Sequence, residues 1–116
     1  MPPAPASVEE LLAAMRAEYR AALPGKLAAI ESLWQGLAAG TSSELGELRR
    51  LVHSLAGSAK TFGLPEVGLA ARGLENEIIA AGEPGAGPLA ARAAQIAAQL
   101  RALRQAAVGG QDARSG

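Results

Sequence analysis

The sequence predicts an all-α fold, an antiparallel four-helix bundle with an additional N-terminal helix or helix extension. Three observations indicate this. Apolar residues recur at spacings of three and four along most of the chain. Alanine is abundant and β-branched residues are few, which favours helix. No segment shows the apolar and polar alternation of a half-buried strand.

Length and composition indicate one domain with one core. The chain has 116 residues, of which 49% are apolar and only 3% aromatic. We therefore expect a core of Leu, Ile, Val and Ala. The sequence predicts a bundle over residues 7–108, between disordered tails at residues 1–6 and 109–116.

The first helical segment begins at Ser7, which forms a Ser-x-x-Glu capping box with Glu10. Pro24-Gly25 interrupts the segment. Either one helix ends near Ala22 and another begins at Pro24, or a single long helix kinks there. Gly40 ends the pattern. The apolar positions before and after the proline are Val8, Leu11, Leu12, Met15 and Tyr19, then Leu23, Leu27, Ile30, Trp34 and Leu37.

Thr41 and Glu44 form a second possible capping box, and Gly63 is well placed to end the helix that follows. Pro65 suits the first turn of the next helix. The inward positions of these two helices are Leu48, Leu51, Val52, Leu55, Ala59 and Phe62, then Val67, Ala70 or Ala71, Leu74 and Ile78.

Residues 82–88 read GEPGAGP and predict a loop. Pro88 begins the last helix. Its apolar stripe is Leu89, Ala93, Ile96, Leu100 and Leu103.

Charge and residue usage exclude several functions. Eleven basic residues balance eleven acidic ones, so the basic excess of a nucleic-acid binder is missing. Without cysteine and with one histidine, we expect no metal site. Because neither a secretory signal nor a membrane span is apparent, we expect a free-standing, monomeric, cytoplasmic protein.

His53 is the residue most indicative of function. At about 100° per residue, it lies roughly 150° from the centre of the apolar arc of its helix, so it faces solvent. Its neighbours on that face are Arg49, Ala56, Gly57 and Lys60. A lone exposed histidine is usually only a surface residue. Gly57, however, costs about 1 kcal/mol in a helix interior, and its missing side chain clears space beside the imidazole. Arg49 and Lys60 would attract an anion such as a phosphoryl group.

The run from His53 to Glu75 resembles the histidine-containing phosphotransfer (HPt) domain of bacterial two-component phosphorelays. The family pattern is roughly His-x-Leu-Lys-Gly-Ser-Ala, three residues and Gly, with a Leu-Glu pair about one helix later. This chain has His53, Leu55, Gly57, Ser58, Ala59, Gly63, Leu74 and Glu75 at these places. The helix number and the length fit too, so the resemblance covers nearly the whole chain.

The resemblance implies a phosphorelay carrier, not an independent catalyst. His53 would accept a phosphoryl group from an aspartate of a response-regulator receiver domain and donate it to another. The expected partners are receiver domains and a histidine kinase, in some cases a hybrid kinase. The protein would need no cofactor of its own, because the Mg²⁺ belongs to the receiver.

The same resemblance assigns a phosphoryl neighbourhood and a docking surface. The neighbourhood contains Lys60, Gly57, Ala56, Arg49 and Glu75, and the docking surface contains Arg50, Ala56, Gly57, Lys60 and Arg72. Glu75 would orient the free ring nitrogen of His53, directly or through water, although an ordinary surface carboxylate is an equal alternative.

One departure from the family pattern is Ala56, where the family commonly has a lysine that steadies the phosphoryl oxygens. Lys60 lies one turn further on the same face and would take over part of that role. Two other functions remain open. One is a non-phosphorylated helical adaptor that sequesters a receiver or another signalling protein. The other is a hydrolase with His53 as general base, which Ser54 and Ser58 do not favour because neither completes a triad.

Overall fold

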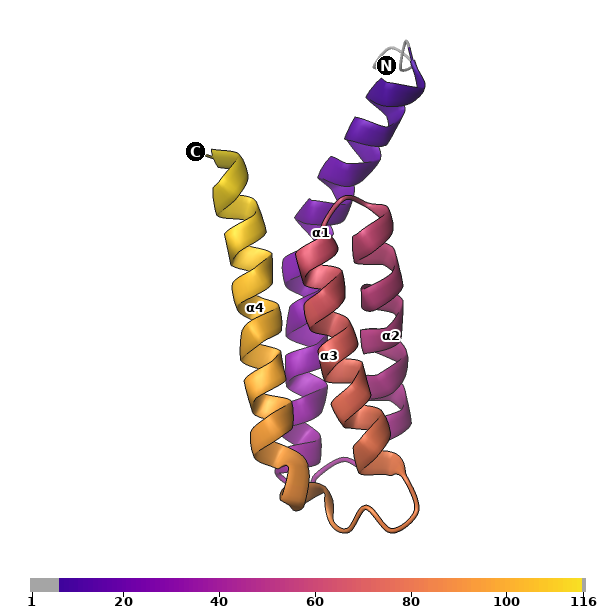
Figure 1. Cartoon of the computed structure of the whole chain (residues 1–116), viewed down its shortest axis with the longest axis vertical. Helices are drawn as coiled ribbons and strands as arrows, with labels where there is room; N and C mark the ends of the chain where they lie inside the picture. The colour runs from indigo at the N-terminus through magenta and orange to yellow at the C-terminus, as the bar shows by residue number, and fades with distance from the viewer. Residues whose placement is uncertain (1–6, 116) are drawn as a thin grey trace.

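Four antiparallel helices surround one elongated core in the computed structural model, which describes the backbone of residues 7–115 and the side chains of residues 7–109 (Figure 1). The elements are α1 (Val8–Ala38), α2 (Leu45–Thr61), α3 (Pro65–Gly82), a short 3₁₀ helix η1 (Leu89–Arg92) and α4 (Ala93–Ser115). Helix α3 packs against α2 and α4, and α1 closes the bundle by contacting both α2 and α4. The predicted all-α bundle is confirmed.

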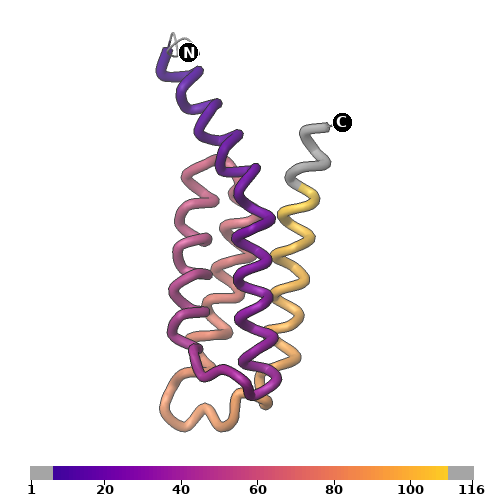
Figure 2. Tube along the Cα trace, turned by 180° about the vertical axis from the view of Figure 1, so that it is seen from behind, coloured from indigo at the N-terminus to yellow at the C-terminus, as the bar shows by residue number. Residues whose placement is uncertain are grey.

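Helix α1 begins where the sequence predicts. The Ser7 hydroxyl accepts a hydrogen bond from the Glu10 N–H at 3.1 Å. The helix then continues through Pro24, so the additional N-terminal element is an extension of α1. Leu23 and Leu27 are buried on either side of the proline, and their packing holds the helix together across the lost hydrogen bond. Figure 2 shows the N-terminal part of α1 leaning away from the other helices.

The predicted capping box of Thr41 and Glu44 is wrong. Helix α2 begins at Leu45, and Glu44 is its N-cap without a side-chain capping bond. The Thr41 hydroxyl instead donates to the Gly36 carbonyl at 3.2 Å, at the end of α1. Ser42 accepts from the Glu44 N–H at 3.2 Å. The hydroxyls of this connection therefore stabilise the turn between the helices and not the first turn of α2.

Gly63 ends α2 as predicted. It has a φ of +83°, and the Leu64 N–H donates to the Ala59 carbonyl at 2.8 Å. The Gly63 N–H donates to the Lys60 carbonyl at 3.3 Å, which completes a Schellman motif. Pro65 then occupies the first turn of α3. This three-residue connection places α3 directly beside α2.

The last helix differs from its predicted bounds at both ends. Its first turn after Pro88 is the 3₁₀ helix η1, and regular α-helix begins only at Ala93. At the other end, α4 continues to Ser115, beyond the boundary at residue 108 that the sequence predicts. The predicted tail at residues 1–6 lies outside the described residues.

The core consists mainly of the aliphatic side chains that the helical spacing predicts. The exception is the first part of α1. Tyr19 and the apolar positions of α1 after it are buried, whereas Val8, Leu11, Leu12 and Met15 are exposed. At the surface, Arg104 of α4 donates to Glu31 of α1 at 2.9 Å through Nε. This hydrogen bond lowers the pKa of Glu31 and ties the first helix to the last. The largest fully buried side chains are Leu23, Ile30, Leu48, Val52, Val67, Leu74, Ile78, Ile96 and Leu103.

Candidate functional site

A histidine and a glutamate from neighbouring helices meet at the surface of the α2–α3 pair. His53, in the middle of α2, exposes 74% of its side chain, whereas Glu75 of α3 exposes only 9%. The His53 Nδ1 atom and the Glu75 Oε2 atom are 2.6 Å apart. The solvent-facing position predicted for His53 is confirmed, and the structure places Glu75 in direct contact with it, without a bridging water.

This hydrogen bond assigns the protons of the imidazole. An ionised carboxylate can only accept, so Nδ1 of the neutral ring carries the hydrogen. Nε2 is then the unprotonated nitrogen with an available lone pair. No side chain among residues 7–109 is hydrogen-bonded to Nε2. The geometry therefore presents Nε2 to solvent as a nucleophile.

Glu75 reaches His53 because α3 approaches α2 closely. Leu74 and Ile78 anchor this part of α3 in the core, and Glu75 lies at the edge of that buried face. About two helical turns before Glu75, Gly68 faces α2. A Cβ added at Gly68 would be 3.2 Å from the Ala56 carbonyl oxygen. Any larger residue would push the helices apart. Gly68 is a site-forming residue that the sequence reasoning missed, and its only signal is a glycine inside a helix.

Ala56 does not lie where the sequence reasoning placed it. It is 4% exposed and faces α3, so it offers no surface to a partner or to a phosphoryl group. The physical reason is that α3 approaches α2 closely at Gly68 and so buries a wider face of α2 than the apolar arc predicts. The close approach of Gly68 also favours a small residue at position 56.

Gly57, by contrast, opens toward solvent. A side chain added there would meet no atom within 4 Å of its Cβ. Lys60, one turn further along, and Arg72 on α3 are also exposed. These three residues and His53 lie on the outer surface of the α2–α3 pair, which is consistent with an accessible histidine.

The two arginines before His53 differ in their pairing. Arg50 donates to Glu47 at 2.9 Å through Nε, which lowers the pKa of Glu47 and raises that of Arg50. Arg49 is exposed and has no ion pair within the described part of the chain. Arg49 is therefore the arginine whose charge is available to an anion at His53, together with the unpaired Lys60.

His53 opens onto an indentation between α2 and α3. A shallow hollow of about 290 Å³ is lined by Gly46, Arg49, Arg50, His53 and Glu75. A second hollow of about 380 Å³ shares Gly46 and Arg49 with it and continues over an apolar floor of Leu45, Ile78 and Ile79. The two form a groove that leads along the helices to the imidazole. Helical periodicity does not predict this groove, because two helices form it together.

Ser58 does not serve as a nucleophile beside His53. Its hydroxyl is hydrogen-bonded to the Tyr19 hydroxyl at 2.7 Å. Tyr19 also stacks on Phe62, with ring centroids 4.8 Å apart. Ser58 therefore belongs to the contact between α1 and the end of α2, and in the described part of the chain no serine is hydrogen-bonded to His53.

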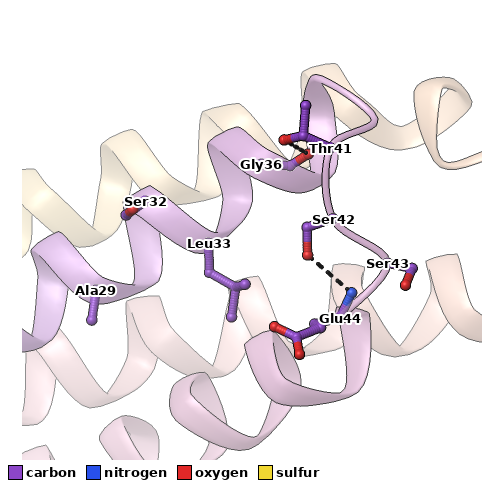
Figure 3. Close-up of a pocket in the computed structure, with 8 residues that line it drawn as sticks. All are labelled: Ala29, Ser32, Leu33, Gly36, Thr41, Ser42, Ser43 and Glu44. Atoms are coloured by element: carbon purple, nitrogen blue, oxygen red, sulfur yellow. Dashed lines mark hydrogen bonds between the residues drawn. The ribbon is translucent and has the colours of Figure 1, made fainter.

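A separate open hollow of about 650 Å³ lies at the α1–α2 connection (Figure 3). It is lined by Ala29, Ser32, Leu33 and Gly36 of α1 and by residues 41–44. The Thr41 hydroxyl donates to the Gly36 carbonyl of α1, and the Ser42 hydroxyl accepts from the Glu44 N–H (Figure 3). The hollow contains no histidine and one carboxylate, Glu44, so it has no group comparable to the His53–Glu75 pair.

The site is an exposed imidazole, oriented by a buried carboxylate, on the surface of a small helical bundle. In the comparison with known families, the family model of the Hpt domain matches residues 6–106. The chain belongs to the Hpt domain family. No curated protein and no solved structure matches it.

Family membership places the protein in two-component signalling, in which Hpt domains act as phosphocarriers and interact with response-regulator receivers and histidine kinases. No helix in the described part of the chain is long and apolar enough to cross a membrane.

Proposed function

We propose that this protein is a phosphorelay carrier in which Nε2 of His53 accepts a phosphoryl group from the aspartyl phosphate of a receiver domain and donates it to another receiver. The observation that carries the proposal is the 2.6 Å contact of Glu75 with Nδ1, because it leaves Nε2 as the exposed nucleophile.

The transfer forms an N–P bond at Nε2 and breaks the P–O bond of the aspartyl phosphate, with the aspartate carboxylate as leaving group. The imidazole becomes positively charged when Nε2 bonds to phosphorus, since Nδ1 keeps its hydrogen. The Glu75 carboxylate, 2.6 Å from Nδ1, offsets this charge. Donation to the next receiver reverses the same steps, so Glu75 supports transfer in both directions.

Most of the remaining electrostatic stabilisation would come from the receiver. Phosphoryl transfer depends mainly on positioning and on neutralising the phosphoryl oxygens. We propose that the carrier needs no cofactor of its own and that the receiver supplies Mg²⁺. On the carrier, Arg49 and Lys60 are exposed cations of α2 without an ion pair in the described part of the chain, and Lys60 takes over part of the role of the family lysine missing at Ala56.

We propose that the receiver docks over the groove and the outer faces of α2 and α3. The groove has an apolar floor and leads to His53. Gly57, Arg72 and Lys60 border the histidine on the exposed side. Arg50 would contribute less than Arg49, since Glu47 already neutralises it.

The test is phosphotransfer profiling against the host's kinases and receivers, with wild type and His53→Gln. Gln is chosen because its amide can still donate a hydrogen bond to Glu75. We expect an acid-labile, base-stable label on the wild type and none on His53→Gln. Equal labelling of both proteins, or no labelling by any kinase or receiver, would refute the proposal.

The alternative function is an adaptor that sequesters a receiver without being phosphorylated. Ala56 in place of the family lysine is the observation that favours it. An adaptor would bind its receiver equally well as His53→Ala, and the cellular output would change little. A carrier would lose its output with the same variant, so the two functions are separable.

A further inference from the structure

The N-terminal turns of α1 project beyond the rest of the bundle (Figure 1). The last contacts with the α2–α3 connection are made by Tyr19, which stacks on Phe62, and by Arg16, whose Nε would be 3.5 Å from a Cβ on Gly63. Residues 8–15 therefore extend past the end of α2 and α3. At 1.5 Å per residue, this projecting segment is about 12 Å long.

The projecting segment exposes a continuous apolar stripe. Val8 is 71% exposed, Leu11 46%, Leu12 41% and Met15 39%. Their spacing of three and four residues places them on one face of the helix. That face continues the buried stripe of α1, which begins with Tyr19. The apolar face of α1 thus extends beyond the bundle, where it is exposed to solvent. A contiguous exposed apolar surface of this kind indicates an interaction site.

The charges beside the stripe favour a second copy of the same segment as its occupant. Glu9 and Arg16 are seven residues apart, so both lie on the same flank of the stripe. In an antiparallel pair related by a two-fold axis near Leu12, Glu9 of one copy lies opposite Arg16 of the other, and the contact occurs twice. In a parallel pair, the two copies of this flank would lie on opposite sides of the interface, so Glu9 and Arg16 would not meet.

We propose that residues 8–16 of α1 form a self-association surface on which two copies of the protein pack antiparallel, with Val8, Leu11, Leu12 and Met15 in the contact. The sequence predicts a monomer, because its apolar spacing assigns these residues to the core stripe of the first helix. Four apolar side chains from each copy make a small interface, so we expect a weak dimer, with a dissociation constant of tens of micromolar or more, on the order of 10⁻⁵–10⁻⁴ M.

This surface is separate from the phosphoacceptor. His53 precedes Phe62 by nine residues, which is about 14 Å along α2. It also faces the outer surface of the α2–α3 pair, where Glu75 holds it. Dimerisation through the projecting segment therefore leaves His53 accessible, and the proposal does not depend on whether His53 is phosphorylated.

The first test is sedimentation equilibrium of the full chain at concentrations up to about 0.5 mM. We expect the wild-type mass to rise with concentration from 11.7 kDa toward twice that value. Leu12→Glu should stay monomeric throughout. Leu69→Glu is the control, because Leu69 is also an exposed leucine, 72% against 41% for Leu12, and lies on α3. This control should dimerise as the wild type does.

The second test determines the orientation. The chain has no cysteine, so single cysteines report contacts without background. Leu12→Cys should form a disulfide-linked dimer, since the two-fold axis lies near this position. Val8→Cys should not, because the two Val8 positions are about 12 Å apart along an antiparallel pair. Glu9→Arg and Arg16→Glu should each weaken the dimer about fivefold, and the double reversal should restore it.

Several results would overturn the proposal. One is a single 11.7 kDa species at every concentration together with no Leu12→Cys cross-link. Others are equal effects of Leu12→Glu and Leu69→Glu, efficient cross-linking through Val8→Cys, or a charge reversal that the double variant does not rescue. A wild type that stays monomeric but binds lipid vesicles or a receiver through Leu12 would assign the stripe to another partner and would also refute self-association.

Discussion

The Nδ1 atom of His53 and the Oε2 atom of Glu75 are 2.6 Å apart, and the two side chains lie in opposite environments. The imidazole is 74% exposed and the carboxylate 9%. The buried carboxylate has no other hydrogen-bond partner in the described part of the structure. A single contact therefore fixes the ring that faces solvent and satisfies the acid that lies beneath it.

Removing the Glu75 carboxylate should slow phosphoryl transfer. We expect Glu75→Ala to reduce the transfer rate about 10- to 100-fold, because a charge-assisted hydrogen bond contributes about 1.5–3 kcal/mol. Glu75→Gln keeps an acceptor for the Nδ1 hydrogen but not the charge, so its rate should lie between those of the wild type and Glu75→Ala. Rapid-quench measurement of transfer from a phosphorylated receiver gives the three rates. Equal rates would show that the contact has no part in transfer.

Removing His53 should affect stability as well as transfer. His53→Ala leaves the Glu75 carboxylate without its partner, and we expect unfolding to become easier by about 1–3 kcal/mol. His53→Gln should cost less, since its amide can donate to Glu75. Urea denaturation followed by circular dichroism compares the two variants at pH 7. If His53→Ala is as stable as His53→Gln, a hydrogen bond to the Glu75 carboxylate does not contribute to the free energy of unfolding.

Two glycines inside helices should respond in opposite ways to alanine. A Cβ at Gly57 meets no atom within 4 Å, so Gly57→Ala should stabilise the protein by about 0.5–1 kcal/mol. A Cβ at Gly68 would be 3.2 Å from a backbone oxygen of α2, so Gly68→Ala should destabilise it by about 1–3 kcal/mol. The same urea experiment measures both changes. Gly57→Leu adds a functional test, since it should fold but transfer more slowly. Unimpaired transfer would show that Gly57 clears no space for a partner.

Lys60→Ala should shorten the lifetime of the phosphorylated protein or reduce its transfer rate. We expect a change of about threefold to tenfold, because an exposed cation acts on the phosphoryl oxygens through solvent. The lifetime follows from the loss of label from purified phosphoprotein with time. Arg101→Ala, an exposed cation on α4, is the control and should leave both quantities unchanged. If Lys60→Ala behaves like this control, Lys60 does not replace the family lysine that this chain lacks at position 56.

Tyr19 should make stability fall at alkaline pH. Burial raises the pKa of its phenol above the ordinary value of 10, although the hydrogen bond with Ser58 opposes this. The folded state therefore favours the neutral phenol. Its contribution is fully present below pH 10 and is lost as the pH rises through the raised pKa of the folded state.

Tyr19→Phe removes this titration and one hydrogen bond, which costs about 0.5–1.5 kcal/mol at pH 7. Thermal denaturation between pH 8 and about 11 should show the variant approaching the wild type as the pH rises. Parallel curves for the two proteins would contradict the assignment.

The sequence by itself determined the fold class, most helix ends and the exposure of His53. Each is a local property. Gly63 and Pro65 set the α2–α3 turn through their own backbone preferences, and the apolar spacing of α2 fixes which way position 53 points. The motif around His53 also indicated the family that the comparison confirms.

Only the tertiary structure decided what lies next to these residues. The apolar spacing of α2 could not reveal that Ala56 is buried, because the close approach of α3 covers a wider face of α2 than the apolar arc predicts. The apolar spacing of α1 predicts that Leu12 and Tyr19 are both in the core. Helices α2 and α3, however, do not extend as far along α1 as Leu12, so Leu12 is exposed. The contact of Glu75 with His53 depends on how closely Gly68 lets the helices approach. Burial and contact depend on where neighbouring helices begin, end and cross, and a single helix's periodicity contains none of that information.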